Sequence, residues 1–126
     1  MEFMSTALKI LAVDDQPAVT TSMRYIFSGP RYDVTGVEDP VEALARLEHD
    51  STRYDIIILD QKMPELTGID LVSAIRQRGI ASKIVVLSAH LSPEIRDAYK
   101  RLNVHVVMDK PFDIDDLRSA VDRLAA

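Results

Sequence analysis

The chain has 126 residues, of which 47% are hydrophobic, and this is the size and apolar content of one ordinary domain. Its 20 acidic and 15 basic residues give a formal net charge of −5 at pH 7, which disfavours a general nucleic-acid-binding surface. No cysteine is present, so the sequence excludes disulfides and thiolate metal sites.

The start of the chain shows no secretory pattern, and no apolar run approaches membrane-spanning length. We therefore expect a cytoplasmic protein that has no membrane partner. A second methionine, Met4, follows the first three residues, which we interpret as a cloning remnant. Residues 1–7 are expected to be an N-terminal extension, and residues 8–126 one domain.

Four short runs are almost wholly apolar, as expected for parallel strands that are buried on both faces of a sheet. These runs are residues 10–13, 56–59, 84–87 and 104–108, the last of which is interrupted by His105. Segment 32–38 is more polar and contains Gly36, so an edge strand is expected there.

The segments between these strands have helical spacing, for example Val19, Met23 and Ile26. Capping residues support the helix starts, which we place after Asp39, Ser92 and Asp113. Five strands alternating with five helices predict an α/β fold with a doubly wound parallel sheet and right-handed crossovers.

A polar residue follows or ends each buried strand. These residues are Asp14 and Asp15 after the first, Asp60 after 56–59, Ser88 after 84–87 and Lys110 after the last. Since the carboxyl ends of parallel strands share one edge of the sheet, these side chains should converge where α/β sheets bind ligands.

Clustered carboxylates repel one another unless a cation neutralises them, and oxygen ligands select a hard ion such as Mg²⁺. Lys110 would supply a fixed positive charge for a phosphoryl group, and Ser88 could donate a hydrogen bond to one of its oxygens. Asp60 is then the candidate nucleophile, with an aspartyl phosphate as the product.

Each of these residues has an ordinary structural explanation when it is taken alone. An aspartate at a strand end commonly caps the next helix or turn, and a lone lysine is commonly solvated. Independent capping does not explain why acids, hydroxyl and ammonium all fall on the appropriate strand ends. The joint pattern therefore favours a functional site.

Four segments in order resemble the receiver domains of response regulators in two-component signalling, and the resemblance spans residues 8–124. These segments are KILAVDD at 9–15, DIIILDQKMPELTGIDL at 55–71, LSA at 87–89 and KPF at 110–112. The resemblance implies the flavodoxin-like strand order 2-1-3-4-5, which a chemotaxis member of the family exemplifies.

The resemblance also implies roles for particular residues. Asp60 would be phosphorylated by a histidine kinase or histidine phosphotransfer protein, and the chain would signal to a downstream protein or output domain. It would assist its own phosphorylation and dephosphorylation without being an enzyme. Mg²⁺ or Mn²⁺ would be held by Asp14, Asp15, Asp60 and the backbone carbonyl of Lys62. The Lys110–Pro111 peptide bond would be cis.

One position departs from the family pattern, because Val107 occupies the place where the family often has tyrosine or phenylalanine. A short β-branched side chain cannot swing as a ring does, so we expect no aromatic switch at this position. The segment 89–102 should carry the response to phosphorylation instead. His105 is interpreted as an ordinary strand histidine.

Three alternatives differ in class. A receiver-like binding module would signal without phosphorylation, which the intact acid, hydroxyl and lysine set disfavours. A haloacid-dehalogenase-type phosphatase usually has a second aspartate two residues after its nucleophile, where this chain has Lys62. A flavodoxin-like cofactor protein needs a phosphate-cradling loop, but the acidic segment 14–17 would repel a phosphate.

Overall fold

The computed structural model describes residues 7–49 and 54–126. The expected N-terminal extension, residues 1–7, lies outside the described residues except for Ala7.

The described residues form strands and helices in strict alternation. The strands are β1 (Leu8–Val13), β2 (Tyr32–Val37), β3 (Ile56–Leu59), β4 (Lys83–Ser88) and β5 (Val106–Asp109). The helices are α1 (Pro17–Ile26), α2 (Pro40–His49), α3 (Gly68–Gln77), α4 (Pro93–Arg101) and α5 (Ile114–Ala125). The expected α/β alternation is therefore confirmed.

All strand pairs are parallel, and the order across the sheet is β2-β1-β3-β4-β5. This is the order that the family resemblance implies, and β2 lies at an edge as its polar composition predicts. The central strand β3 is buried along its whole length, because its four apolar residues face helices on both sides.

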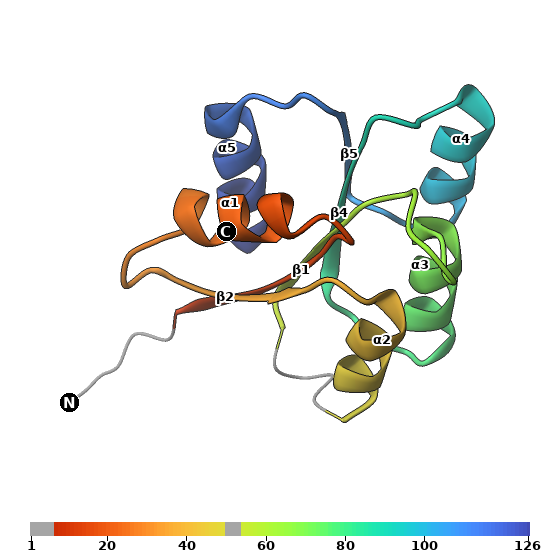
Figure 1. The fold of residues 1–126 in the computed structure, drawn as a ribbon, viewed down its shortest axis with the longest axis horizontal. Coiled ribbons are helices and arrows are strands. Elements are labelled where there is room, and N and C mark those ends of the chain that lie inside the picture. The colour runs from red at the N-terminus through yellow and green to blue at the C-terminus, as the bar shows by residue number, and fades with distance from the viewer. Residues whose placement is uncertain (1–6, 50–53) are drawn as a thin grey trace.

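The helices cover the two faces of the sheet unequally, with α1 and α5 on one side and α2, α3 and α4 on the other (Figure 1). Side chains alternate between the faces along each strand. Leu11 and Val13 of β1 join the core beneath α2, α3 and α4, whereas Ile10 and Ala12 join the core beneath α1 and α5.

Side-chain caps begin several helices where the sequence predicts them. Asp39 accepts a hydrogen bond from the backbone of Val41, Ser92 from Ile95, and Asp113 from Asp116. These bonds satisfy N–H groups that have no partner within the first turn of a helix.

Strand β5 begins two residues later than the predicted 104–108. The reason is the end of α4, where Asn103 has a positive φ of 59° and the Val104 N–H returns to the Tyr99 carbonyl at 3.1 Å. Pairing with β4 starts only when the His105 N–H reaches the Ile84 carbonyl at 3.0 Å.

Arg76 of α3 fixes the C-terminal end of α4. Its guanidinium donates to the carbonyls of Leu102 at 3.1 Å and Asn103 at 3.0 Å, and also to those of Ile80 and Ser82, each at 3.2 Å. Burial lowers the pKa of Arg76. The four carbonyls replace part of the water around a partly buried charge and join the end of α4 to the start of β4.

Two further sequence expectations concern the backbone and the membrane. The Lys110–Pro111 peptide bond is cis, as the family resemblance implies. Among the described helices, none combines the length and the apolar character needed to cross a membrane.

Candidate functional site

The strand ends meet at one edge of the sheet. Backbone pairing continues beyond the strands themselves, since the Asp14 N–H bonds to the Val37 carbonyl and the Asp60 N–H to the Val13 carbonyl, each at 3.2 Å. Lys110 is held in the same way, with its N–H 3.0 Å from the Ser88 carbonyl. The rigid sheet thereby places side chains that lie far apart in the sequence next to one another.

Three carboxylates converge at this edge. Asp14, Asp15 and Asp60 each offer an oxygen, and these oxygens lie within 4.8 Å of one another. Asp14 and Asp60 are buried, with 4% and 7% of their surface exposed, whereas Asp15 is exposed. The cluster is therefore seated in the protein but open to solvent on the side of Asp15.

Lys110 reaches into the cluster with its ammonium group. Its Nζ lies 2.8 Å from Oδ2 of Asp14 and 3.5 Å from Oδ2 of Asp60. Because the side chain of Lys110 is only 18% exposed, water screens these ion pairs less than it screens pairs on the surface. One ammonium cannot neutralise three carboxylates.

The pKa of the Asp14 carboxyl group is shifted mainly by burial. Burial raises the pKa of the Asp14 carboxyl, and the nearby charge of Asp60 adds to the rise. Hydrogen bonds from Lys110 and from the Gln16 N–H, the latter at 3.0 Å, oppose it. A second cation among these oxygens would stabilise the charged form of all three acids.

The donor set fits a hard divalent cation. All three side chains offer carboxylate oxygens, and Mg²⁺ typically takes one or two carboxylates while keeping water on its other positions. The exposed side of Asp15 leaves room for such water. A softer metal would call for nitrogen or sulfur ligands, which this cluster does not contain.

Ser88 ends β4 and Lys62 follows β3 closely, but they make no direct bonds to the acids among the described contacts. Ser88 is fully buried at the end of β4, and its hydroxyl oxygen accepts a hydrogen bond from the His90 N–H at 3.1 Å. Lys62 lies in the loop after β3 with an exposed side chain. The proposed roles of the Ser88 hydroxyl and the Lys62 carbonyl stay predictions.

Val107 of β5 and His105, which directly precedes β5, both serve the fold. Val107 packs, partly buried, against the core beneath α2, α3 and α4. His105 accepts a hydrogen bond through Nδ1 from the Ile84 N–H at 3.2 Å, at the amino end of the β4–β5 pair. Burial, together with the charges of Arg76 and Lys83, lowers its pKa.

Sequence reasoning missed Gln61 and Tyr99. Gln61 directly follows Asp60, is only 8% exposed, and accepts a hydrogen bond from the hydroxyl of Tyr99 in α4. Its backbone N–H donates to Oδ1 of Asp60 at 2.7 Å. One signal was available in the sequence, because Tyr99 is the bulkiest side chain on the apolar stripe of an otherwise charged helix.

Comparison with known proteins gives one consistent result. A family model described as the response regulator receiver domain matches residues 10–122. Response regulator MprA of Mycobacterium leprae is 35% identical over 117 residues, which cover 93% of this chain and 50% of that protein. Sporulation initiation phosphotransferase F of Bacillus subtilis is 27% identical, with 91% of each chain covered.

Solved structures of other proteins share the fold of this chain. Chemotaxis protein CheY4 of Vibrio cholerae superimposes with a TM-score of 0.84 at 30% identity, covering 94% of this chain and 99% of that one. The receiver domain of Francisella response regulator 1452 gives a TM-score of 0.84 at 31% identity, covering 93% and 95%. The chain spans about half the length of MprA and of Bacillus subtilis PhoP, 50% and 46% respectively.

Proposed function

The chain belongs to the response regulator receiver domain family, and from this premise we propose that Asp60 accepts a phosphoryl group in two-component signalling. The donor would be a histidine kinase or a histidine phosphotransfer protein in the cytoplasm. The receiver of the signal would be a downstream protein or output domain that binds the phosphorylated chain more tightly than the unmodified one.

The proposed transfer uses the two oxygens of Asp60 differently. Oδ1 accepts the Gln61 N–H, and Oδ2 faces Lys110. Oδ2 would attack the phosphorus of a phosphohistidine, forming an O–P bond as the P–N bond breaks. The electron pair of that bond stays on the imidazole nitrogen, which then takes up a proton.

Lys110 and Ser88 would stabilise the transferred group. The Lys110 ammonium stands 3.5 Å from Asp60 Oδ2, so it is already close to where phosphoryl oxygens would gather negative charge. Ser88 uses its oxygen to accept from His90, which leaves its hydroxyl proton able to donate to a phosphoryl oxygen. Both groups would assist removal of the phosphoryl group by water as well as its arrival.

Asp14, Asp15 and Asp60, with the Lys62 carbonyl, would hold Mg²⁺ or Mn²⁺. When bound, the ion would neutralise the acids and the phosphoryl oxygens, so that two negatively charged groups can approach each other. This chain's own contribution is to seat the carboxylates on two backbone segments, those that follow β1 and β3. Weak, saturable binding of the metal to the unmodified chain is expected.

The observation that carries the proposal is the meeting of Asp14, Asp15, Asp60 and Lys110 at one sheet edge. The test is incubation with acetyl phosphate and Mg²⁺, followed by intact-protein mass measurement. The parent chain should gain one phosphoryl group. Asp60→Asn should gain none, and excess chelator should suppress labelling of the parent.

A matched control comes from the same sheet edge. Asp109 ends β5, but its carboxylate pairs with Arg96 at 2.6 Å and lies outside the acidic cluster. Asp109→Asn should therefore be labelled like the parent. Equal labelling of Asp60→Asn and the parent would show that another residue is the acceptor. Absence of labelling in the parent would favour a receiver-like binding module.

A further inference from the structure

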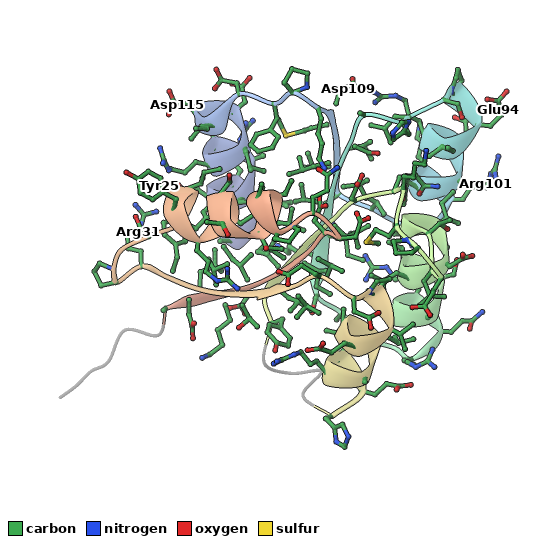
Figure 2. All side chains as sticks on the ribbon, in the orientation of Figure 1. Tyr25, Arg31, Glu94, Arg101, Asp109 and Asp115 are labelled. Carbon is green, nitrogen blue, oxygen red and sulfur yellow. The ribbon has the colours of Figure 1, made fainter. Side chains whose placement is uncertain are left out.

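Tyr99 is the largest fully buried side chain of the described residues, and it comes from the most polar of the helices. Figure 2 shows Glu94 and Arg101 projecting outward from α4, on the side away from the sheet. Tyr99 instead packs within the core beneath α2, α3 and α4, where Val107 also packs. Among the described residues, the one fully buried aromatic ring of that cluster is thus supplied by α4 and not by β5, while Tyr54 packs against the cluster partly buried.

The hydroxyl of Tyr99 donates to the side-chain oxygen of Gln61. Burial, with smaller contributions from the charges of Asp60 and Asp70, raises the pKa of Tyr99, so this hydroxyl is protonated and acts as the donor. The same Gln61 oxygen accepts the Ile69 N–H at 3.2 Å. One amide oxygen therefore joins the loop after β3 to both α3 and α4.

The backbone of Gln61 is equally constrained. Its N–H donates to Oδ1 of Asp60 at 2.7 Å, and its carbonyl accepts the Gly68 N–H at 2.8 Å. A Cβ at Gly68 would collide with the Tyr99 hydroxyl and would lie 2.7 Å from the Asp60 carbonyl oxygen. The absence of a side chain at Gly68 is what lets Tyr99 reach Gln61.

We propose that Tyr99 is a positioning residue for Asp60 and that it couples the chemical state of Asp60 to helix α4. The coupling rests on the proposed function, in which Asp60 becomes an acyl phosphate. Tyr99 orients Gln61, and Gln61 in turn orients the Asp60 carboxylate through its N–H.

The direction of the coupling follows from charge. A hydrogen bond to an ionised acceptor is about twice as strong as one to a neutral acceptor. When Asp60 is phosphorylated, Oδ1 changes from a carboxylate oxygen to the carbonyl oxygen of a neutral acyl group. The bond that fixes Gln61 weakens, Gln61 can shift, and Tyr99 carries the shift into α4.

The test compares Tyr99→Phe with Tyr32→Phe. Both variants lose one tyrosine hydroxyl bond, since Tyr32 donates to Asp122 at 2.7 Å on the other face of the sheet. Tyr99→Phe should be phosphorylated by acetyl phosphate about two- to tenfold more slowly, as expected for loss of one buried hydrogen bond. Tyr32→Phe should match the parent, and urea unfolding of both variants checks that they are folded.

The second readout is the set of amide chemical shifts with and without beryllofluoride, a phosphoryl mimic. In the parent, residues 93–102 should shift on addition of the mimic. In Tyr99→Phe these shifts should shrink while those at residues 14, 15 and 60 persist. If Tyr99→Phe matches Tyr32→Phe in both rate and shifts, Tyr99 is only a core side chain and the proposal is wrong.

Gln61→Leu shows whether the effect passes through Gln61. Because the two residues act in series, the double variant Gln61→Leu/Tyr99→Phe should be no slower than the slower single variant. If the rate reductions of the two single variants multiply in the double variant, Tyr99 does not act through Gln61. A measurement on the unphosphorylated chain tests this proposal independently of the proposed function. The amide chemical shift of Gln61 should change in Tyr99→Phe even if no phosphorylation occurs. An unmoved signal would overturn the positioning role.

Discussion

Helices α5 and α4 lie on opposite faces of the sheet, and they bond to it at opposite ends. On the face of α1 and α5, Tyr32 at the start of β2 bonds to Asp122, and Lys83 at the start of β4 donates to the Leu124 carbonyl at 2.5 Å. Both bonds lie at the amino ends of the strands, remote from the acids. On the face of α2, α3 and α4, the Gln61–Tyr99 bond begins beside Asp60.

This difference separates residues that stabilise the fold from residues that would respond to phosphorylation of Asp60. The bonds that Tyr32 and Lys83 make to α5 can stabilise the fold without sensing the charge on Asp60, because they are far from the site. The start of α1 is close to the site, since the Gln16 N–H donates to Asp14. The face of α4 has a hydrogen-bonded connection from the site to a helix. We therefore expect substitutions in the contacts of α5 to change the free energy of unfolding, and those around Tyr99 to change the response as well.

The largest expected effect is in the contacts of α5. Leu117→Ala removes a fully buried side chain of α5 and should lower the free energy of unfolding by about 2–5 kcal/mol. Leu124→Ala, at a partly buried position of the same helix, should cost less. Urea unfolding measures both. If folded Leu117→Ala lost the chemical-shift changes that beryllofluoride causes at residues 93–102, the contacts of α5 would not be limited to stabilising the fold.

Gly68→Ala should give a smaller loss of stability but a change in the response. The new Cβ would lie 2.9 Å from the Gln61 Cα and against the Tyr99 hydroxyl, so overpacking of about 1–3 kcal/mol is expected. Phosphorylation should also slow, because Gln61 is displaced. Gly79→Ala is the control: its φ of 70° makes alanine unfavourable, but no atom lies within 4 Å of the added Cβ.

The two glycine variants sharpen the comparison between stability and response. Gly79→Ala should lose stability through its backbone alone and keep the parent's rate of phosphorylation. If Gly68→Ala destabilises the chain but leaves both the rate and the shifts of residues 93–102 intact, the packing around Gln61 does not control the site.

The smallest expected effect is a pH dependence at the amino ends of β4 and β5. The pKa of His105 is lowered in the folded chain from its ordinary value of 6.5. As the pH falls below 6.5, the unfolded chain takes up a proton that the folded chain does not, so stability decreases until the folded pKa is passed. Above that range the full contribution is present.

Urea unfolding at a series of pH values from neutral to mildly acidic checks this expectation. In His105→Gln the fall in stability toward acid should be shallower than in the parent, since this residue no longer titrates. Phosphorylation of the folded chain should not share the effect, because His105 bonds to Ile84 at the edge opposite the acids. Identical slopes in both chains would contradict the assignment.

The sequence predicted what local pattern determines. Apolar runs located the strands, and the residues that follow them, Asp14, Asp60 and Lys110, do meet at one edge. The Gln61–Tyr99 bond joins residues 38 positions apart, and its existence depends on how α4 packs against α3. Neither periodicity nor strand-end position contains that information, so only the structure could show it.

Arg76 holds the C-terminal end of α4 through its hydrogen bonds to the carbonyls of Leu102 and Asn103, so a rotation of α4 would pivot about this end. At about 1.5 Å of rise per residue, Tyr99 lies about 4.5 Å along the axis from Leu102, whereas Pro93 lies about 13.5 Å away. A rotation about the C-terminal end of α4 would move Pro93 about three times as far as Tyr99. A displacement too small to disturb the packing around Tyr99 would thus become a larger movement at the distant end of the helix.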